Sequence, residues 1–111
     1  MAGTFVVEKS RNGKFRFNLR AGNNQVILTS GMYAAKAGAL NGVESVRKNA
    51  ADDSRFTRKT AKDGSAYFVL TAANAEVIGK SEMYASKSSM ENGIRSVQAN
   101  AAAAKLIDRT T

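Results

Sequence analysis

Six of the cationic side chains and one tyrosine are selected as a candidate polyanion-binding site. They are Lys14, Arg16, Arg20, Arg55, Arg58, Lys59 and Tyr67. The cations could contact phosphates while the tyrosine ring stacks on a base of a single-stranded nucleic acid. Lys and Arg outnumber Asp and Glu by 17 to 9, and residues 1–62 hold 12 of these bases and 4 of the acids. This uneven charge is compatible with a polyanionic partner, but a basic surface with no nucleic-acid role is the first interpretation, because net charge alone is a weak guide to function.

The residue types exclude most familiar catalytic chemistry. Cysteine and histidine are both absent, so thiol chemistry, disulfides and a typical zinc site are ruled out. No glycine-rich stretch has the spacing of a nucleotide-phosphate loop. The one adjacent acid pair of the first half, Asp52 and Asp53, is not repeated in the second half. We therefore expect no enzyme activity, no cofactor and no metal site.

Two copies of one sequence unit make up the chain. Residues 5–53 and 56–104 align without a gap at an offset of 51 and match at 20 of 49 positions. A fixed period of this length indicates repeated supersecondary units, and one unit alone would bury too little surface to be stable. We expect a single domain over residues 1–111, with repeats at about 4–53 and 55–104 related by a pseudo-two-fold axis and a closing strand at 106–109.

Each repeat is expected to form three strands followed by a helix. Residues 14–20 alternate between apolar and polar side chains, which is typical of an antiparallel sheet with one face toward water. Asn12-Gly13 and its counterpart Asp63-Gly64 predict hairpin turns, because both residues tolerate positive φ. Strands are predicted near 4–9, 14–21, 25–29, 55–60, 65–72, 76–80 and 106–109, and helices near 36–50 and 87–103. The strand at 55–60 both closes the first unit and opens the second.

The fold class that follows is α+β, with order βββα-βββα-β and both helices on one face of a single antiparallel sheet. Ser86 is a good N-cap for the second helix, whereas Ala35 at the same place in the first repeat is not. Gly42 and Gly93 lie within the helices, where glycine costs about 1 kcal/mol relative to alanine. We expect them to permit close approach of each helix to its neighbours.

Other residues kept in both repeats are interpreted as structural. Tyr33 and Tyr84 stand at the entry to the two helices, where a tyrosine more often packs its ring than binds a ligand. The pairs Asn41/Asn92 and Asn49/Asn100 are expected to make caps or hydrogen bonds within the fold.

The stretch NNQVILTSGMYAAKAGALNGVESVRKNA and its copy NAEVIGKSEMYASKSSMENGIRSVQANA resemble the YegP-like family, also called DUF1508 or UPF0339. The shared pattern is an FRFNL-type strand after a turn glycine, an Asn-rich turn, V-I, S-x-x-Y and N-G-[VI]-x-S-V-x-x-N-A. The resemblance covers nearly the whole chain in its tandem-repeat form. It implies two joined units with terminal strands exchanged, and it implies no activity, because the family is uncharacterised.

The sequence therefore predicts a small, basic, non-enzymatic module whose partner is unknown. A protein-binding or structural role, through the sheet face or an edge strand, is the first hypothesis. The alternative is weak, salt-sensitive binding of single-stranded nucleic acid by the basic face of the first repeat. We expect a monomer, because the duplication acts as a fused dimer, and a cytoplasmic location, because neither a membrane span nor a secretory signal is found.

Overall fold

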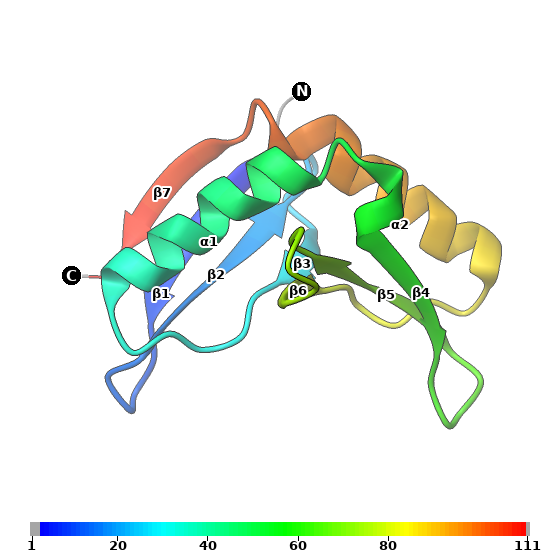
Figure 1. Ribbon diagram of the computed structural model, residues 1–111, viewed down its shortest axis with the longest axis horizontal. Coiled ribbons are helices and arrows are strands. Elements are labelled where there is room, and N and C mark those ends of the chain that lie inside the picture. Colours follow the sequence, from blue (N-terminus) through cyan, green and yellow to red (C-terminus); the bar gives the residue numbers. More distant parts are fainter. Residues whose placement is uncertain (1–2, 111) are drawn as a thin grey trace.

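The computed structural model describes residues 3–110 and contains seven strands and two α-helices in the predicted order (Figure 1). The elements are β1 (Thr4–Lys9), β2 (Phe15–Arg20), β3 (Val26–Thr29), α1 (Lys36–Asn49), a 3₁₀ turn (Asp53–Arg55), β4 (Phe56–Thr60), β5 (Ala66–Thr71), β6 (Val77–Lys80), α2 (Lys87–Ala101) and β7 (Lys105–Arg109). The predicted boundaries hold to within one or two residues, and the α+β class is confirmed.

All seven strands form one sheet in the order β4-β5-β6-β3-β2-β1-β7. The two repeats meet at its centre, where Thr29 of β3 pairs with Lys80 of β6, its counterpart at the offset of 51. Figure 1 shows both helices above the sheet, and the β1–β2 and β4–β5 turns at its two lower corners. The arrangement is the expected pseudo-two-fold pair of βββα units.

The direction of β7 differs from the prediction of a wholly antiparallel sheet. β7 runs parallel to β1, with Thr4 opposite Lys105 and Glu8 opposite Arg109. The chain leaves α2 beside the start of β1, where the Lys105 N–H donates to the Gly3 carbonyl at 3.2 Å. From that point it can only follow β1 in the same direction, so the sheet is mixed.

Four hairpin loops share one conformation of three residues. In the first, the Gly13 N–H donates to the Ser10 carbonyl at 3.0 Å and the Ser10 N–H to the Lys14 carbonyl at 2.8 Å. This pattern is a type I turn followed by one left-handed residue. The left-handed positions of the four loops are held by Gly13, Asn24, Gly64 and Ala75.

The side chain before each left-handed residue is an Asn or Asp that closes the loop. Its carboxamide or carboxylate oxygen accepts from the N–H two residues on at 2.9–3.1 Å. The hairpin turns predicted at Asn12-Gly13 and Asp63-Gly64 are confirmed, with positive φ at the two glycines. Asn12 and Asp63 act as hydrogen-bond acceptors in Asx turns, and only the residue after them is left-handed.

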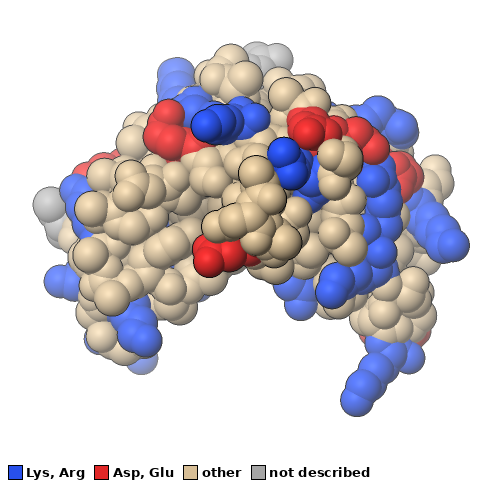
Figure 2. Space-filling model, viewed as in Figure 1, with Lys and Arg blue, Asp and Glu red and all other residues tan. Residues whose placement is uncertain are grey.

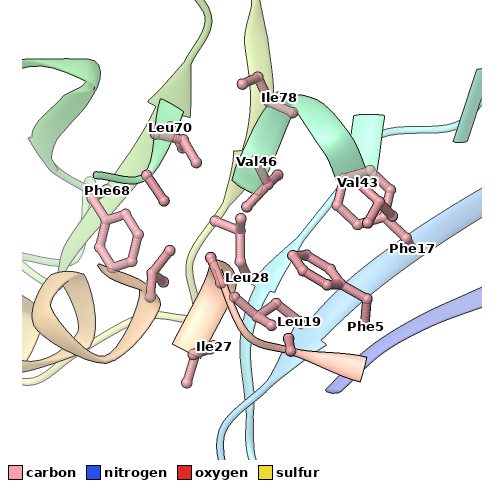
Figure 3. Close-up of a cluster of buried hydrophobic side chains, with 14 of the residues drawn as sticks. Phe5, Phe17, Leu19, Ile27, Leu28, Val43, Val46, Phe68, Leu70 and Ile78 are labelled. Atoms are coloured by element: carbon pink, nitrogen blue, oxygen red, sulfur yellow. The ribbon is translucent and has the colours of Figure 1, made fainter. Parts of the chain in front are cut away.

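The two repeats share one hydrophobic core beneath the helices. Figure 3 shows apolar side chains of both repeats converging there, from Phe5, Phe17 and Leu28 of the first to Phe68 and Ile78 of the second. The aromatic contacts occur twice, since each central phenylalanine lies edge-on to another phenylalanine and stacks on a tyrosine. Either repeat alone would expose its half of this core to water.

The helix glycines and caps are as expected. A Cβ at Gly42 would lie 2.5 Å from the Tyr33 hydroxyl and 2.6 Å from the Phe17 ring, and Gly93 is equally close to Tyr84. The Ser86 hydroxyl accepts from the Ser89 N–H at 3.1 Å, so it caps α2. Ala35 provides no such bond to α1.

Candidate functional site

The structure divides the seven residues of the predicted polyanion site between the two halves of the sheet. Arg16 and Arg20 lie on β2, and Lys14 directly precedes it, whereas Arg58 and Lys59 lie on β4. Three strands separate β2 from β4, a distance of about 19 Å at roughly 4.8 Å per strand. Figure 2 shows Lys and Arg at the two lower corners of the molecule and along its upper surface, with mostly uncharged side chains between the two corners. The seven residues do not form one continuous surface.

Several of these cations are already engaged within the protein. Arg58 contacts Glu91 of α2 at 2.8 Å and Asp53 at 3.2 Å, and these hydrogen bonds raise the pKa of its guanidinium. Arg55 lies 3.5 Å from Asp52, and Arg16 lies 3.9 Å from Glu8. Each of these arginines presents less net charge to a ligand than the sequence alone suggests.

One pair of the predicted residues is held together on the sheet face away from the helices. Lys59 lies opposite Tyr67 in the β4–β5 register, and Lys80 of β6 places its ammonium 4.9 Å from the centre of the Tyr67 ring. Sequence reasoning missed Lys80, although it replaces Thr29 of the first repeat. This small basic and aromatic cluster is in the second repeat, not in the first, where the basic face was predicted.

A groove lies on the opposite side of β4, between this edge strand, the start of β5 and the first turns of α2. Its volume is about 400 Å³. It is lined by Arg58, Lys59, Thr60, Ala66, Lys87, Met90 and Glu91. Four of the five residues of β4 are exposed, and this strand ends the sheet. Among residues 3–110 no strand lies on its outer side, so its outer backbone edge can accept another strand.

The equivalent edge in the first repeat is filled by β7. Lys36, the first residue of α1, forms an ion pair with Asp108 of β7. This contact and the Thr110 hydroxyl and backbone hold the pKa of the Asp108 carboxyl down at about 2. The counterpart of Lys36 at the offset of 51 is Lys87, which lines the groove.

Lys87, Met90 and Ala66 were not predicted as site residues. The signal was in the repeat alignment, because residues 105–109 align with 54–58, most of which already form β4. One segment cannot occupy two places in the sheet, so a place beside β4 had to be empty. The alignment alone could not show that this place adjoins a groove.

Two pairs of residues kept in both repeats, Tyr33/Tyr84 and Asn49/Asn100, have structural roles. Tyr33 stacks on Phe17 at 6.2 Å and Tyr84 on Phe68 at 6.5 Å, which confirms their interpretation as packing residues. Burial raises the pKa of both tyrosine hydroxyls. The Asn49 amide donates to the Ser45 carbonyl of its own helix at 2.8 Å, and Asn100 repeats this bond.

Across residues 3–110, no group of three or more acidic side chains gathers where it could hold a metal ion. The Asp52 carboxylate accepts from the Ser54 hydroxyl and N–H, which lower its pKa. Its neighbour Asp53 contacts Arg58, so this acid pair stabilises the turn before β4. Neither helix in this part of the chain is long and apolar enough to cross a membrane.

The chain matches the family model described as a domain of unknown function, DUF1508, twice, over residues 10–56 and 61–108. It is 52% identical over 110 residues to a UPF0339 protein of Bordetella pertussis, covering 99% of this chain and 98% of that protein. It is 47% identical to the UPF0339 protein YegP of Escherichia coli K12, covering 99% and 100%.

Two solved structures have the same fold. The solution structure of yegP from E. coli, described as a protein of unknown function, matches with a TM-score of 0.94 at 47% identity, over 99% of this chain and 95% of that one. A UPF0339 protein of Shewanella oneidensis matches with a TM-score of 0.92 at 44% identity, over 97% and 92%. With both repeats matched and the fold shared end to end, this chain belongs to the DUF1508 (UPF0339, YegP-like) family in its tandem form.

Proposed function

We propose that this protein is a non-enzymatic protein-interaction module that binds its partner at the open edge of β4. The observation that supports this most directly is the contrast between equivalent strands, because β1 is covered by β7 whereas no strand of the described residues lies on the outer side of β4. An extended chain added there would gain main-chain hydrogen bonds, and the adjoining groove would receive its side chains. We also place the protein in the cytoplasm, consistent with its lack of cysteine.

Site-specific crosslinking tests this proposal with a matched control. A photoreactive benzoylphenylalanine replaces Lys59 on the open edge or, in a second variant, Glu8, the equivalent residue of β1 that faces Arg109 of β7. On irradiation in the organism's own cells, the Lys59 variant should form one dominant protein adduct that the Glu8 variant lacks. Equal adducts at both positions, or none at Lys59, would rule out β4 as the binding edge.

Binding of single-stranded nucleic acid is a second candidate function, supported by the formal charge of +8 and by Tyr67 flanked by Lys59 and Lys80. The test is anisotropy of a labelled oligonucleotide at low and moderate salt, where phosphate contacts should weaken steeply. Arg16→Glu should lower affinity if the first repeat binds, and Lys59→Glu if the second repeat binds. No binding of the wild-type protein at low salt would eliminate this function.

A further inference from the structure

We propose that the β4 edge binds an extended segment of a partner protein in the place that β7 takes on β1, and that this segment carries a carboxylate followed two positions later by a large apolar residue. The inference depends on the proposed function and specifies the chemistry of its partner. Figure 1 shows β7 beside β1 at one end of the sheet and β4 at the other end.

The duplication explains why this place is empty. The segment after α2 forms β7 and lies beside β1, the opening strand of the first repeat. The segment after α1 should by symmetry lie beside the opening strand of the second repeat. It instead forms that opening strand itself, β4. The fold therefore has one more strand position than the described residues have strands.

Burial of equivalent residues shows what a strand at this position covers. Val7 of β1 is 0% exposed beneath β7, whereas its counterpart Arg58 in β4 is exposed. Lys36 is half-buried beside β7, whereas its counterpart Lys87 is exposed. The groove residues correspond, at the offset of 51, to the surroundings of the Asp108 end of β7.

The carboxylate is inferred from the lysine at the start of each helix. Lys36 pairs with Asp108, and no ion pair among the described residues involves its counterpart Lys87. In β7 the aspartate lies opposite Val7, so a segment bound in the same register would bring its acid opposite Arg58 and near Lys87. Arg58 already bonds Glu91 and Asp53, so Lys87 is the cation that remains to pair with an acidic side chain at that point.

The apolar residue is inferred from the floor of the groove and from the template. Two positions after Asp108 is Thr110, and continuing the β7 register places it beside Lys9, whose counterpart Thr60 lies opposite Ala66. Ala66 stands where the first repeat has the much larger Phe15, so the second repeat has free volume beside the buried Met90. A large apolar side chain of the partner would fill this volume.

A partner segment fits this position better than a second copy of the chain does. None of the described strands has a carboxylate two positions before a large apolar residue, and β7, which supplies the register, already covers β1. Transferring it to another molecule would expose Phe5 and Val7, which are both 0% exposed. A separate extended segment carries no such cost.

The probe is a synthetic peptide with the sequence of residues 105–110, KLIDRT, added to the full-length ¹⁵N-labelled protein. Amide signals of β4 and the first turns of α2 should shift on titration, while those of β1 stay in place. The peptide with Asp108→Asn should bind more weakly, and the peptide with Thr110→Phe more tightly, because its ring can reach the space above Ala66.

Two protein variants should change peptide affinity in opposite directions. Lys87→Gln should weaken binding about threefold, as expected for an exposed ion pair, and Glu91→Gln should tighten it by removing the carboxylate that now holds Arg58. Lys36→Gln is the matched control in the first repeat and should leave the affinity for the β4 edge unchanged.

Three results would overturn the inference. These are an absence of shifts in β4 at millimolar peptide, shifts confined to the β1 edge, and identical affinity of the wild-type and Asp108→Asn peptides. Concentration-dependent dimerisation through β4, seen in sedimentation, would identify a second copy as the occupant instead. A selective crosslink at Lys59 alongside peptide failure would leave the proposed function intact and refute only this choice of partner chemistry.

Discussion

Replacing Ala75 by glycine or asparagine should stabilise the protein. Ala75 has a φ of 70° at the left-handed position of the β5–β6 loop, where the three equivalent loops have glycine or asparagine. An L-residue with a Cβ loses roughly 1–2 kcal/mol in this conformation, and asparagine tolerates it better than alanine. Glycine removes the clash, but it also raises the conformational entropy of the unfolded chain. This lowers the free energy of unfolding by about 0.4–1 kcal/mol. The net gain expected is therefore about 0.5–1 kcal/mol for Ala75→Gly, with a similar gain for Ala75→Asn.

The assay is equilibrium unfolding in urea together with thermal unfolding. A gain of this size raises Tm by about 2–6 °C in a domain of this length. Asn24 holds the equivalent position in the first repeat with the same φ of 70°, so Asn24→Ala should lower stability by a similar amount. Ala75→Asn and Asn24→Ala are reverse substitutions at equivalent positions of two loops that have the same conformation.

Ala73→Asn is the control, because it adds the same side chain to the same loop at a residue without positive φ. It should change stability by less than half the effect at Ala75. If Ala75→Gly and Ala75→Asn both leave the urea midpoint unchanged, or if Asn24→Ala is neutral, then backbone strain at this position does not limit stability and the reasoning fails.

Three further perturbations test other parts of the fold. Arg47→Gln should cost about 1–2 kcal/mol in urea unfolding, because the guanidinium lies 5.0 Å from the Phe5 ring centre and donates to the last carbonyls of α2; an unchanged midpoint would contradict this role. Ser81→Ala should cost about 1–3 kcal/mol by leaving the buried Phe68 N–H without its acceptor at 3.0 Å, and a cost near zero would show that water replaces the hydroxyl. The depressed pKa of Asp108, about 2 against an ordinary 3.8, means that its ion pair stabilises β7 fully above about pH 4 and is lost as pH falls through 2. The protection factors of the β7 amides, which are corrected for the intrinsic pH dependence of exchange, should accordingly fall in acid, and Asp108→Asn should remove that fall.

Features that depend on local chemistry or on the repeat could be predicted from the sequence. The matched positions indicated two similar units, and the alternation of residues 14–20 indicated which side of β2 faces the core. Gly42 was recognisable because its cost in a helix requires a compensating contact, which the structure places at Tyr33. Ser86 was recognisable as a cap because its oxygen needs only a nearby N–H.

Features that depend on long-range placement could not be predicted. Arg16 and Lys59 both lie in the part of the sequence where basic residues outnumber acidic ones. The distance between them in the structure depends on the order of the strands, which no local sequence pattern specifies. The direction of β7 depends on where α2 ends relative to β1. The places of the hairpin loops were predicted, but the role of Asn12 was not, since an asparagine can adopt positive φ or accept a hydrogen bond, and the structure shows the second.

The charged side chains of β4 affect both nonspecific strand pairing at the open edge and the choice of partner. An uncovered strand tends to pair with any extended chain, and natural proteins reduce this tendency by placing charged side chains along it. Arg58 and Lys59 occupy the positions of Val7 and Glu8 in the covered strand, so the exposed edge is the more cationic one. A neutral or basic segment would have to bury or displace these charges without compensation, whereas a segment with a correctly spaced carboxylate would not. The same residues that discourage nonspecific pairing would therefore select an acidic partner, and reversing the charge at Lys87 should lower affinity for an acidic peptide more than for a neutral one.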